Sequence, residues 1–269
     1  MSTTLEKSTP AKTTSIKSLQ DKAKYVRQEL FKFKTDSKVG HLATCLSTVD
    51  VLVSLYYDEA AVFDPNKDEI IFSKGHGAPA VYPILADLGY IDKAELAKYG
   101  RKGGMLRMHC DASIPQCQFI GGSLGNGIGY AAGRGFEQGN DTYVVLGDGE
   151  LYEGSVWETL MFIAHHNLYS QRLIIDRNEL CILGNTEEII RLEPLAEKFK
   201  AFGFDVAEID GHDFEQMREV FSKKPSRPQV IIANTVKGKG VSYMEGKWEY
   251  HTIIPKDPEQ IRIGKEDLA

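Results

Sequence analysis

Four short segments of the chain are dense in apolar and β-branched side chains, a composition that predicts β-strands. They are TYVVLG (142–147), RLIIDRN (172–178), FDVAEID (204–210) and QVIIANT (229–235). Strands that are almost continuously apolar, rather than alternating, are typical of a sheet that is covered on both faces.

Segments with the spacing of amphipathic helices lie between these strands. Apolar residues recur at helical intervals in 153–168, 192–202 and 213–222. Two further helices are predicted nearer the N-terminus, one beginning at Ser18 as its N-cap and one beginning near Ser47. Strands alternating with helices indicate an α/β fold, with a parallel sheet covered by helices on both faces.

The beginning of the chain differs in composition from the rest. Residues 1–17 are rich in Ser, Thr and Lys, so we expect a disordered N-terminal tail there. Between 18 and 269 the sequence contains no internal repeat and no linker long enough to divide it. We therefore expect one domain over 18–269.

Charge and composition narrow the possible partners. The net charge is −6, whereas nucleic-acid binding usually needs a basic face, so no nucleic-acid partner is expected. No window reaches the roughly 18 consecutive apolar residues of a membrane span, so no membrane partner is expected either. The four cysteines form no CxxC zinc pattern, and the N-terminus lacks the apolar core of a secretory signal. These features favour a cytoplasmic protein with reduced thiols.

The segment Gly147-Asp148-Gly149 is the clearest indication of chemistry, because it joins a predicted strand to a predicted helix. Glycines at such a turn let a phosphate approach the backbone, and the helix N-terminus favours an anion. Asn178 follows the next strand, one strand–helix–strand unit further on. Ligands bind outside the carboxyl ends of parallel strands, so Asp148 and Asn178 can converge there. A carboxylate, an amide oxygen and a backbone carbonyl suit Mg²⁺ when diphosphate oxygens and water complete the shell.

Two other interpretations of the glycine-containing segments are less consistent with the sequence. Asp-Gly is common in turns, so the GDG segment alone would favour an ordinary turn with a capping Asp148. The presence of Asn178 at the matching strand end favours the metal site instead. The glycines of 121–129 could suggest a dinucleotide fingerprint, but they open a small-residue helix rather than follow a strand. Close packing of backbone over a ligand at a helix N-terminus explains them better.

Several longer motifs occur in an order that identifies a family. Over about 18–250 the chain resembles the thiamine-diphosphate-binding domain of transketolases. The motifs that carry this resemblance are SKVGHLATCLS (37–47), FSKGHGAP (72–79), GGSLGNGIG (121–129), DGELYEGSVWE (148–158) and NTVKGKG (234–240). The resemblance implies the thiamine-diphosphate-binding α/β fold, with thiamine diphosphate and Mg²⁺ (or another divalent cation such as Ca²⁺ or Mn²⁺) as cofactors.

The resemblance also implies a role for each matching residue. The metal ligands would be Asp148, Asn178 and the main-chain carbonyl of Leu180. Residues expected to contact the cofactor are His76, Gly122, Ser123, Leu124, Gly147, Gly149, Glu150, Asn178 and His251. Glu153 and Glu158 match acidic residues that lie near the subunit contact in the family.

Three histidines, His41, His109 and His251, would face the donor sugar and act in catalysis. Imidazole suits proton transfer near neutral pH, since its unperturbed pKa is about 6.5. A solitary histidine is more often structural, and only the surrounding motifs distinguish His41 and His76 from that case. By the same reasoning His165 and His166 are interpreted as ordinary helix residues, and His212 as a turn or capping residue.

A second polypeptide follows from the resemblance. In full-length transketolases a later domain supplies the glutamate that activates the cofactor and the arginines that bind sugar phosphate. We therefore expect a separate C-terminal transketolase subunit carrying the pyrimidine-binding domain, in an α₂β₂ assembly. The expected reaction is transfer of a two-carbon ketol unit from a ketose (phosphate) donor to an aldose acceptor, only in the presence of that partner.

Three departures from the family pattern leave the sugar open. The 37–47 motif lacks a proline, 108–119 lacks the usual Gly-His-Pro and Pro-Gly elements, and 248–252 reads WEYHT where Trp-His-Gly is usual. Lys237 and Lys239 are interpreted as part of a solvated, glycine-flanked loop.

Four alternatives remain at this point. The chain could be the α subunit of a 2-oxo-acid dehydrogenase, a relative of deoxyxylulose-phosphate synthase, a non-catalytic subunit that retains the fold, or a nicotinamide-dependent oxidoreductase. The motifs around His41 and His76 favour a transketolase over the other thiamine-diphosphate enzymes.

Overall fold

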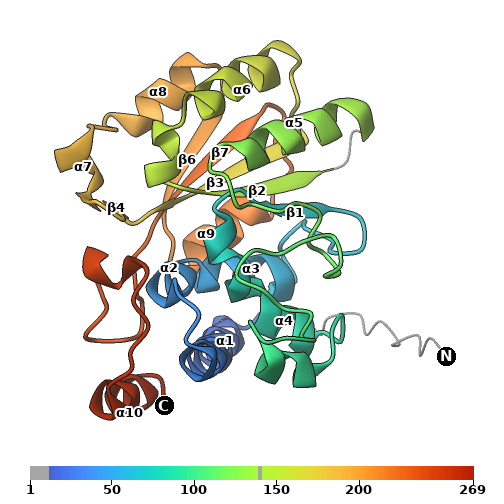
Figure 1. The fold of residues 1–269 in the computed structure, drawn as a ribbon. Coiled ribbons are helices and arrows are strands. Elements are labelled where there is room, and N and C mark those ends of the chain that lie inside the picture. Colours follow the sequence, from blue (N-terminus) through green and yellow to red (C-terminus); the bar gives the residue numbers. More distant parts are fainter. Residues whose placement is uncertain (1–11, 139–140) are drawn as a thin grey trace.

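The computed structural model describes residues 12–138 and 141–269. Its centre is a parallel five-stranded sheet in the order β1-β2-β3-β7-β6 (Figure 1). The strands are β1 (Glu69–Phe72), β2 (Thr142–Gly147), β3 (Gln171–Arg177), β6 (Asp205–Asp210) and β7 (Gln229–Asn234). A small antiparallel hairpin, β4 (Leu180–Cys181) with β5 (Gly184–Asn185), follows β3.

Helices cover both faces of the sheet, which confirms the predicted α/β architecture (Figure 1). One face carries α5 (Asn126–Gln138), α6 (Gly154–His165) and α8 (Leu195–Ala201). The other face carries α1 (Ile16–Ser37), α2 (Leu42–Ser47), α3 (Val49–Tyr57), α4 (Tyr82–Asp87), α9 (Phe214–Phe221) and α10 (Pro258–Asp267). A short helix, α7 (Thr186–Ile189), follows the hairpin. None of the described helices combines the length and apolar character needed to cross a bilayer.

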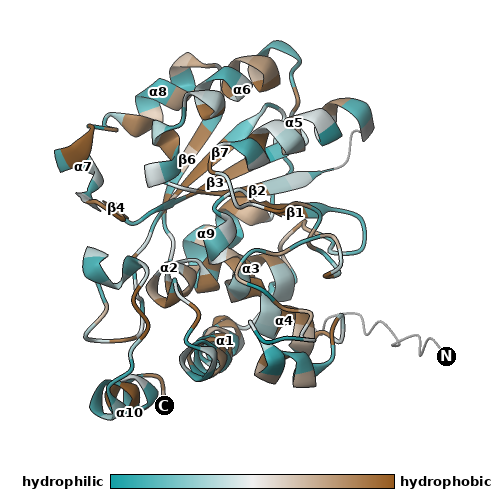
Figure 2. Ribbon diagram, viewed as in Figure 1, coloured by the Kyte–Doolittle hydropathy of each residue, from teal (hydrophilic) through white to brown (hydrophobic). Residues whose placement is uncertain are grey.

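Successive side chains of the central strands enter two different hydrophobic cores. In β2, Tyr143 and Val145 are buried with α1 and α3, whereas Val144 and Leu146 are buried with α5 and α6. Hydrophobic positions accordingly line the strands and the helix faces that approach them (Figure 2). Both faces of each central strand are therefore buried, which explains their nearly continuous apolar sequence.

Some element boundaries differ from those expected. Strand β1 was not predicted, because its apolar run is only three residues long after Glu69. Helix α1 begins before Ser18, and Ser15 is the N-cap, accepting a hydrogen bond from the Ser18 N–H. The helix expected near Ser47 is divided, since α2 ends there and α3 begins at Val49.

The N-terminal tail was expected to extend through residue 17. Residues 1–11 lie outside the described residues, but the rest of that segment is held against the domain. Thr13 forms a parallel bridge with Asp58, and the Lys12 ammonium donates to the carbonyl oxygens of Ala61 and Phe63. These backbone contacts leave no trace in composition, so the expectation of disorder was wrong for 12–17.

A buried ionic group links helices far apart in the sequence. The Arg27 guanidinium on α1 donates to both carboxylate oxygens of Asp50 on α3, at 2.8 and 2.6 Å. His212 Nδ1 lies 2.6 Å from the same carboxylate, and His212 Nε2 accepts the Val236 N–H at 2.8 Å. Burial raises the pKa of Asp50, but Arg27 and His212 outweigh this effect and hold it below its usual range. His212 is therefore an internal bridge between α3 and the segment after β7, rather than a simple turn residue.

The Arg27→Met variant should lower the free energy of unfolding by about 3–5 kcal/mol, because it leaves the Asp50 carboxylate buried without its guanidinium. Urea unfolding followed by circular dichroism measures the loss. The matched control is Arg262→Met on α10, where the guanidinium pairs with Glu259 and Glu266 in solvent and little change is expected. Equal losses in the two variants would contradict the role assigned to Arg27.

Candidate functional site

A cavity of about 160 Å³ opens at the carboxyl ends of β2 and β3. Most residues that the sequence singled out for cofactor or metal binding line it. They are His76, Leu124, Gly147, Asp148, Gly149, Glu150, Asn178, Leu180 and His251. The wall is completed by residues that were not singled out, among them Lys74 and Lys237.

Asp148 is placed by the register of the sheet. Gly147 pairs with Asp176 across β2 and β3, so the residues that follow, Asp148 and Asn178, emerge at the same edge. The Asp148 carboxylate accepts the N–H groups of Gly149 at 2.7 Å and Glu179 at 2.6 Å. Its side chain is almost fully buried, and burial together with the negative charge of Asp176 raises its pKa. A bound cation would therefore stabilise the ionised form of Asp148.

The two other expected metal ligands converge on one point. The Asn178 Oδ1 and the Leu180 carbonyl oxygen both accept hydrogen bonds from the Lys237 ammonium, at 3.2 and 3.0 Å. Two oxygens that face one cationic nitrogen, beside a buried carboxylate, are a donor set of the kind Mg²⁺ uses. The residues present thus fit a divalent cation.

The position of Lys237 corrects the sequence interpretation. It was assigned to a solvated loop, but its exposed fraction is only 2%. The Gly238 N–H donates to the Ala43 carbonyl and the Val236 N–H to His212, which folds the loop over the cavity and turns Lys237 inward. Burial, and then repulsion by Lys74, lower the pKa of Lys237 to about 8. Lys239 remains half-exposed near Glu245, as expected of a loop residue.

The carboxylate of Asp176 organises the cavity floor. It accepts hydrogen bonds from the Ser47 hydroxyl at 2.7 Å, from the Thr235 hydroxyl and from the Lys74 ammonium. It also accepts the Asn178 amide N–H at 3.1 Å. That contact fixes the amide orientation, because the Asn178 nitrogen must face Asp176 and its oxygen must then face the cavity. Burial would raise the pKa of Asp176, but Lys74 and the hydroxyl donors outweigh it and lower it.

Lys74 and Lys237 are the functional candidates that sequence reasoning missed. Both occur beside glycine inside motifs that were quoted for the resemblance, FSKGHGAP and NTVKGKG. That context was the available signal. Their burial could not be seen in the sequence, because glycine and lysine are also typical of exposed loops.

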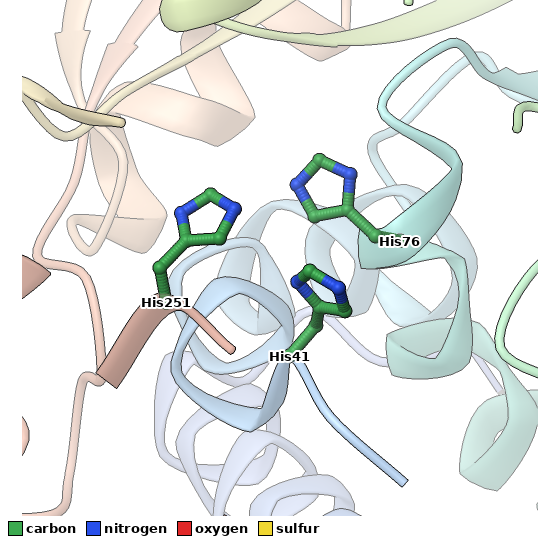
Figure 3. A group of neighbouring side chains, drawn as sticks. All are labelled: His41, His76 and His251. Atoms are coloured by element: carbon green, nitrogen blue, oxygen red, sulfur yellow. The ribbon is translucent and has the colours of Figure 1, made fainter. Parts of the chain in front are cut away.

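Three histidines from separate elements meet at the mouth of the cavity (Figure 3). His41 precedes α2 with a left-handed backbone (φ 68°), His76 lies in the 3₁₀ helix Gly75–Val81, and His251 ends the 3₁₀ helix Trp248–His251. The ring centroid of His41 lies 4.9 Å from that of His76 and 5.3 Å from that of His251. The ring centroids of His76 and His251 are 5.3 Å apart.

All three imidazoles are neutral near pH 7. Burial lowers the pKa of His41 to about 4 and that of His251 to about 3, and nearby lysines reinforce both shifts. Burial and the charge of Lys74 also hold the pKa of His76 below its usual range. A neutral imidazole has one donor and one acceptor nitrogen, so each ring can hold or pass a proton.

His109, Gly122 and Ser123 lie outside the cavity lining. His109 is half-buried, burial lowers its pKa, and its charge would disfavour protonation of His41, so the two rings are neighbours. Gly122 and Ser123 are exposed on the loop that delivers Leu124 to the cavity.

That loop is held by a close backbone contact between two glycines. A Cβ atom on Gly75 would lie only 2.0 Å from the Gly121 carbonyl oxygen. No residue with a side chain could therefore replace Gly75 without moving the loop away from the segment that carries His76.

Glu150 was expected to contact the cofactor, and it does line the cavity. Its carboxylate, however, accepts the Ser73 hydroxyl, the Gly125 N–H at 2.8 Å and the Gly147 N–H at 3.2 Å. The residue is 2% exposed. Glu150 therefore fastens the loop before α5 to the strand ends of β1 and β2.

Replacing Glu150 with Gln should weaken this attachment. The amide would turn an N–H towards one of the three donors, which leaves a buried donor unpaired and lowers the free energy of unfolding by about 1–3 kcal/mol. Chemical unfolding is the measurement, with Glu208→Gln on the exposed side of edge strand β6 as the matched control. Similar unfolding curves for Glu150→Gln and the unmodified chain would contradict the assignment.

Known proteins with related sequences and structures share these features. The family model for the transketolase, thiamine diphosphate binding domain matches residues 20–268. One of the two subunits named for an apulose-4-phosphate transketolase in Actinobacillus succinogenes is 36% identical over 264 residues, covering 93% of this chain and 95% of the relative. A 6-deoxy-6-sulfo-D-fructose transketolase subunit of a Clostridium species is 36% identical over 249 residues, covering 87% and 90%.

Full-length enzymes match over one part of their chains. Human transketolase is 30% identical over 262 residues, which are 91% of this chain and 42% of the human protein. The crystal structure of transketolase from Campylobacter jejuni superimposes with a TM-score of 0.82 at 28% identity, covering 94% of this chain and 43% of that one. The chain therefore belongs to the transketolase family and carries its thiamine-diphosphate-binding domain.

Proposed function

We propose that the chain is one subunit of a thiamine-diphosphate- and Mg²⁺-dependent transketolase that transfers a two-carbon ketol unit from a ketose phosphate to an aldose. The observation that carries the proposal is the convergence of Asp148, Asn178 and the Leu180 carbonyl in one cavity beside three neutral histidines. When bound, thiamine diphosphate supplies the carbanion chemistry that breaks a carbon–carbon bond next to a carbonyl.

The metal and diphosphate would be held at the strand ends. Asp148, Asn178 and Leu180 would contribute three oxygen ligands to Mg²⁺, and diphosphate and water would complete the octahedron. The Lys237 ammonium now contacts two of those oxygens, and its flexible stem lets it turn towards a phosphate when the metal takes its place. The Gly149 N–H and the His76 ring lie in the wall of the same cavity, and Lys74 adds a second buried cation there.

His41, His109 and His251 would handle the protons of the sugar hydroxyls. Since burial keeps these imidazoles neutral, each can accept a proton from one hydroxyl and donate one to another without first losing a charge. His251 lines the cavity, and His41 contacts both His76 and His251 through its ring. This arrangement orients a sugar by hydrogen bonds rather than by fixed positive charge.

The sugar itself is proposed only as a class. The relatives named for apulose 4-phosphate and for 6-deoxy-6-sulfo-D-fructose are subunits whose names specify different sugars. In this chain the segment 108–119, which departs from the family pattern, carries His109 between the buried side chains of Leu106 and Cys110. We expect this segment to decide which sugar is accepted.

A partner subunit is part of the proposal. This chain spans 95% of the Actinobacillus relative, which is named as one subunit of its enzyme, but only 42% of human transketolase. The outer face of α5 and α6 exposes Phe136, Met161 and Phe162, which are 58%, 56% and 38% exposed. Glu158 lies beside Phe162, and Glu153 is exposed at the start of the same helix. We assign this face to the contact with a partner carrying the pyrimidine-binding domain, in an α₂β₂ assembly.

The four cysteines are free and three are buried. Thiols that remain unpaired suit a reducing compartment, so we place the enzyme in the cytoplasm.

Co-expression with the transketolase subunit encoded next to it tests the proposal directly. Glycolaldehyde transfer from xylulose 5-phosphate to ribose 5-phosphate should appear in the mixture with thiamine diphosphate and Mg²⁺, and in neither chain alone. The mixture should also have the mass of two copies of each chain. Decarboxylation of pyruvate without ketol transfer would instead favour a 2-oxo-acid enzyme or a deoxyxylulose-phosphate synthase.

The Asp148→Ala variant should weaken Mg²⁺-dependent binding of thiamine diphosphate by at least about tenfold, because it removes the one charged ligand of the metal. Isothermal titration calorimetry of the assembled subunits measures the affinity, and circular dichroism checks the fold. Asp205→Ala, at an exposed position on β6, is the matched control. Unchanged affinity in Asp148→Ala would refute the metal assignment.

A further inference from the structure

The histidine group at the cavity mouth has a property that proton transfer does not require. Within residues 12–138 and 141–269, His41, His76 and His251 form a group of three metal-ligating side chains. One ring nitrogen from each lies within 4.8 Å of the other two. The three rings surround a common space (Figure 3).

The ring nitrogens are available to a ligand. The Nδ1 atoms of His41 and His251 are buried and have no hydrogen-bond partner in the described part of the chain. Buried polar atoms without partners are uncommon, because each forfeits the hydrogen bond it would make in water. The rings are also neutral, which is the form that coordinates a metal.

The spacing is close to that of a tetrahedral metal site. A zinc–nitrogen bond of about 2.0–2.1 Å places tetrahedral ligand atoms roughly 3.3 Å apart. The longest separation in the group would therefore have to shorten by roughly 1.5 Å. His41 and His251 are borne on short segments at the ends of helical turns, and rotation about their side-chain bonds supplies a movement of this size.

The chemistry of the donors distinguishes this group from the oxygen site deeper in the cavity. Three imidazoles favour borderline ions such as Zn²⁺, whereas carboxylate, amide and carbonyl oxygens favour Mg²⁺. Two cations oppose any metal here, but Lys74 is paired with Asp176 and Lys237 is engaged with Asn178 and Leu180. Their repulsion reduces the affinity without removing a ligand.

We propose that His41, His76 and His251 form a second metal site, which binds Zn²⁺ or a similar transition-metal ion through three imidazole nitrogens. Water or a substrate hydroxyl would take the fourth position. An ion held there occupies the three rings that would otherwise meet the sugar, so zinc would inhibit the enzyme without displacing Mg²⁺. The inference concerns binding by this chain alone and does not rest on the proposed reaction.

Zinc titration of the full chain tests the site without cofactor or partner. The chain is first stripped with a chelator and then titrated with ZnCl₂ by calorimetry in an excess of Mg²⁺. One Zn²⁺ per chain should bind, and thermal melting should shift upwards with zinc concentration. Substitution of cobalt should produce the visible absorption of a four-coordinate site. Displacement of zinc by Mg²⁺, or an octahedral cobalt spectrum, would overturn the proposal.

Variants assign the ligands. His251→Gln and His76→Gln should each lower zinc affinity by at least about tenfold, while Asp148→Ala should leave it within about twofold. The matched control is the combined change of His165 and His166 to Ala, two adjacent histidines at the end of α6. Glutamine keeps a polar group in each buried position, and melting without metal verifies the fold. Zinc binding that survives both glutamine variants, or that is lost in the α6 control, would refute the site.

Discussion

The architecture of the site depends on one buried carboxylate at the end of the central strand. Asp176 joins α2 through Ser47, the turn after β1 through Lys74, and the segment after β7 through Thr235. It also orients the amide of Asn178. A charge buried this deeply is stable only when cationic and hydroxyl donors surround it. The positions of these segments, and hence the shape of the cavity, are therefore mutually dependent.

A second buried group acts at longer range on the same cavity. Arg27, Asp50 and His212 tie α1 and α3 to the backbone of Val236, the residue before Lys237. The lysine that reaches the metal ligands is thus set by contacts behind the site as well as within it. Each of these buried charges has a stated partner, which is the condition under which polar networks specify a single arrangement.

Much of this arrangement could be predicted from the sequence, and the failures have a common physical cause. The strands around Val144 and Ile174 were recognisable because burial on both faces requires nearly continuous apolar residues. Asp148 and Asn178 could be brought together because parallel strands end at one edge. Lys237, His212 and the segment at Thr13 were misjudged, since their positions depend on contacts with residues far away in the chain. Local pattern carries no information about such partners.

The order of strands in the sheet has a consequence for how the protein is made. Strand β7 lies between β3 and β6, although it is the last of the five to be synthesised. Until 229–234 leaves the ribosome, β3 has a neighbour on one edge only, and β6 has none. At roughly 5–20 residues per second, this interval lasts for seconds, during which an apolar strand edge is open to other chains. Protection of the nascent chain by a chaperone is therefore most valuable between the completion of β3 and the arrival of β7.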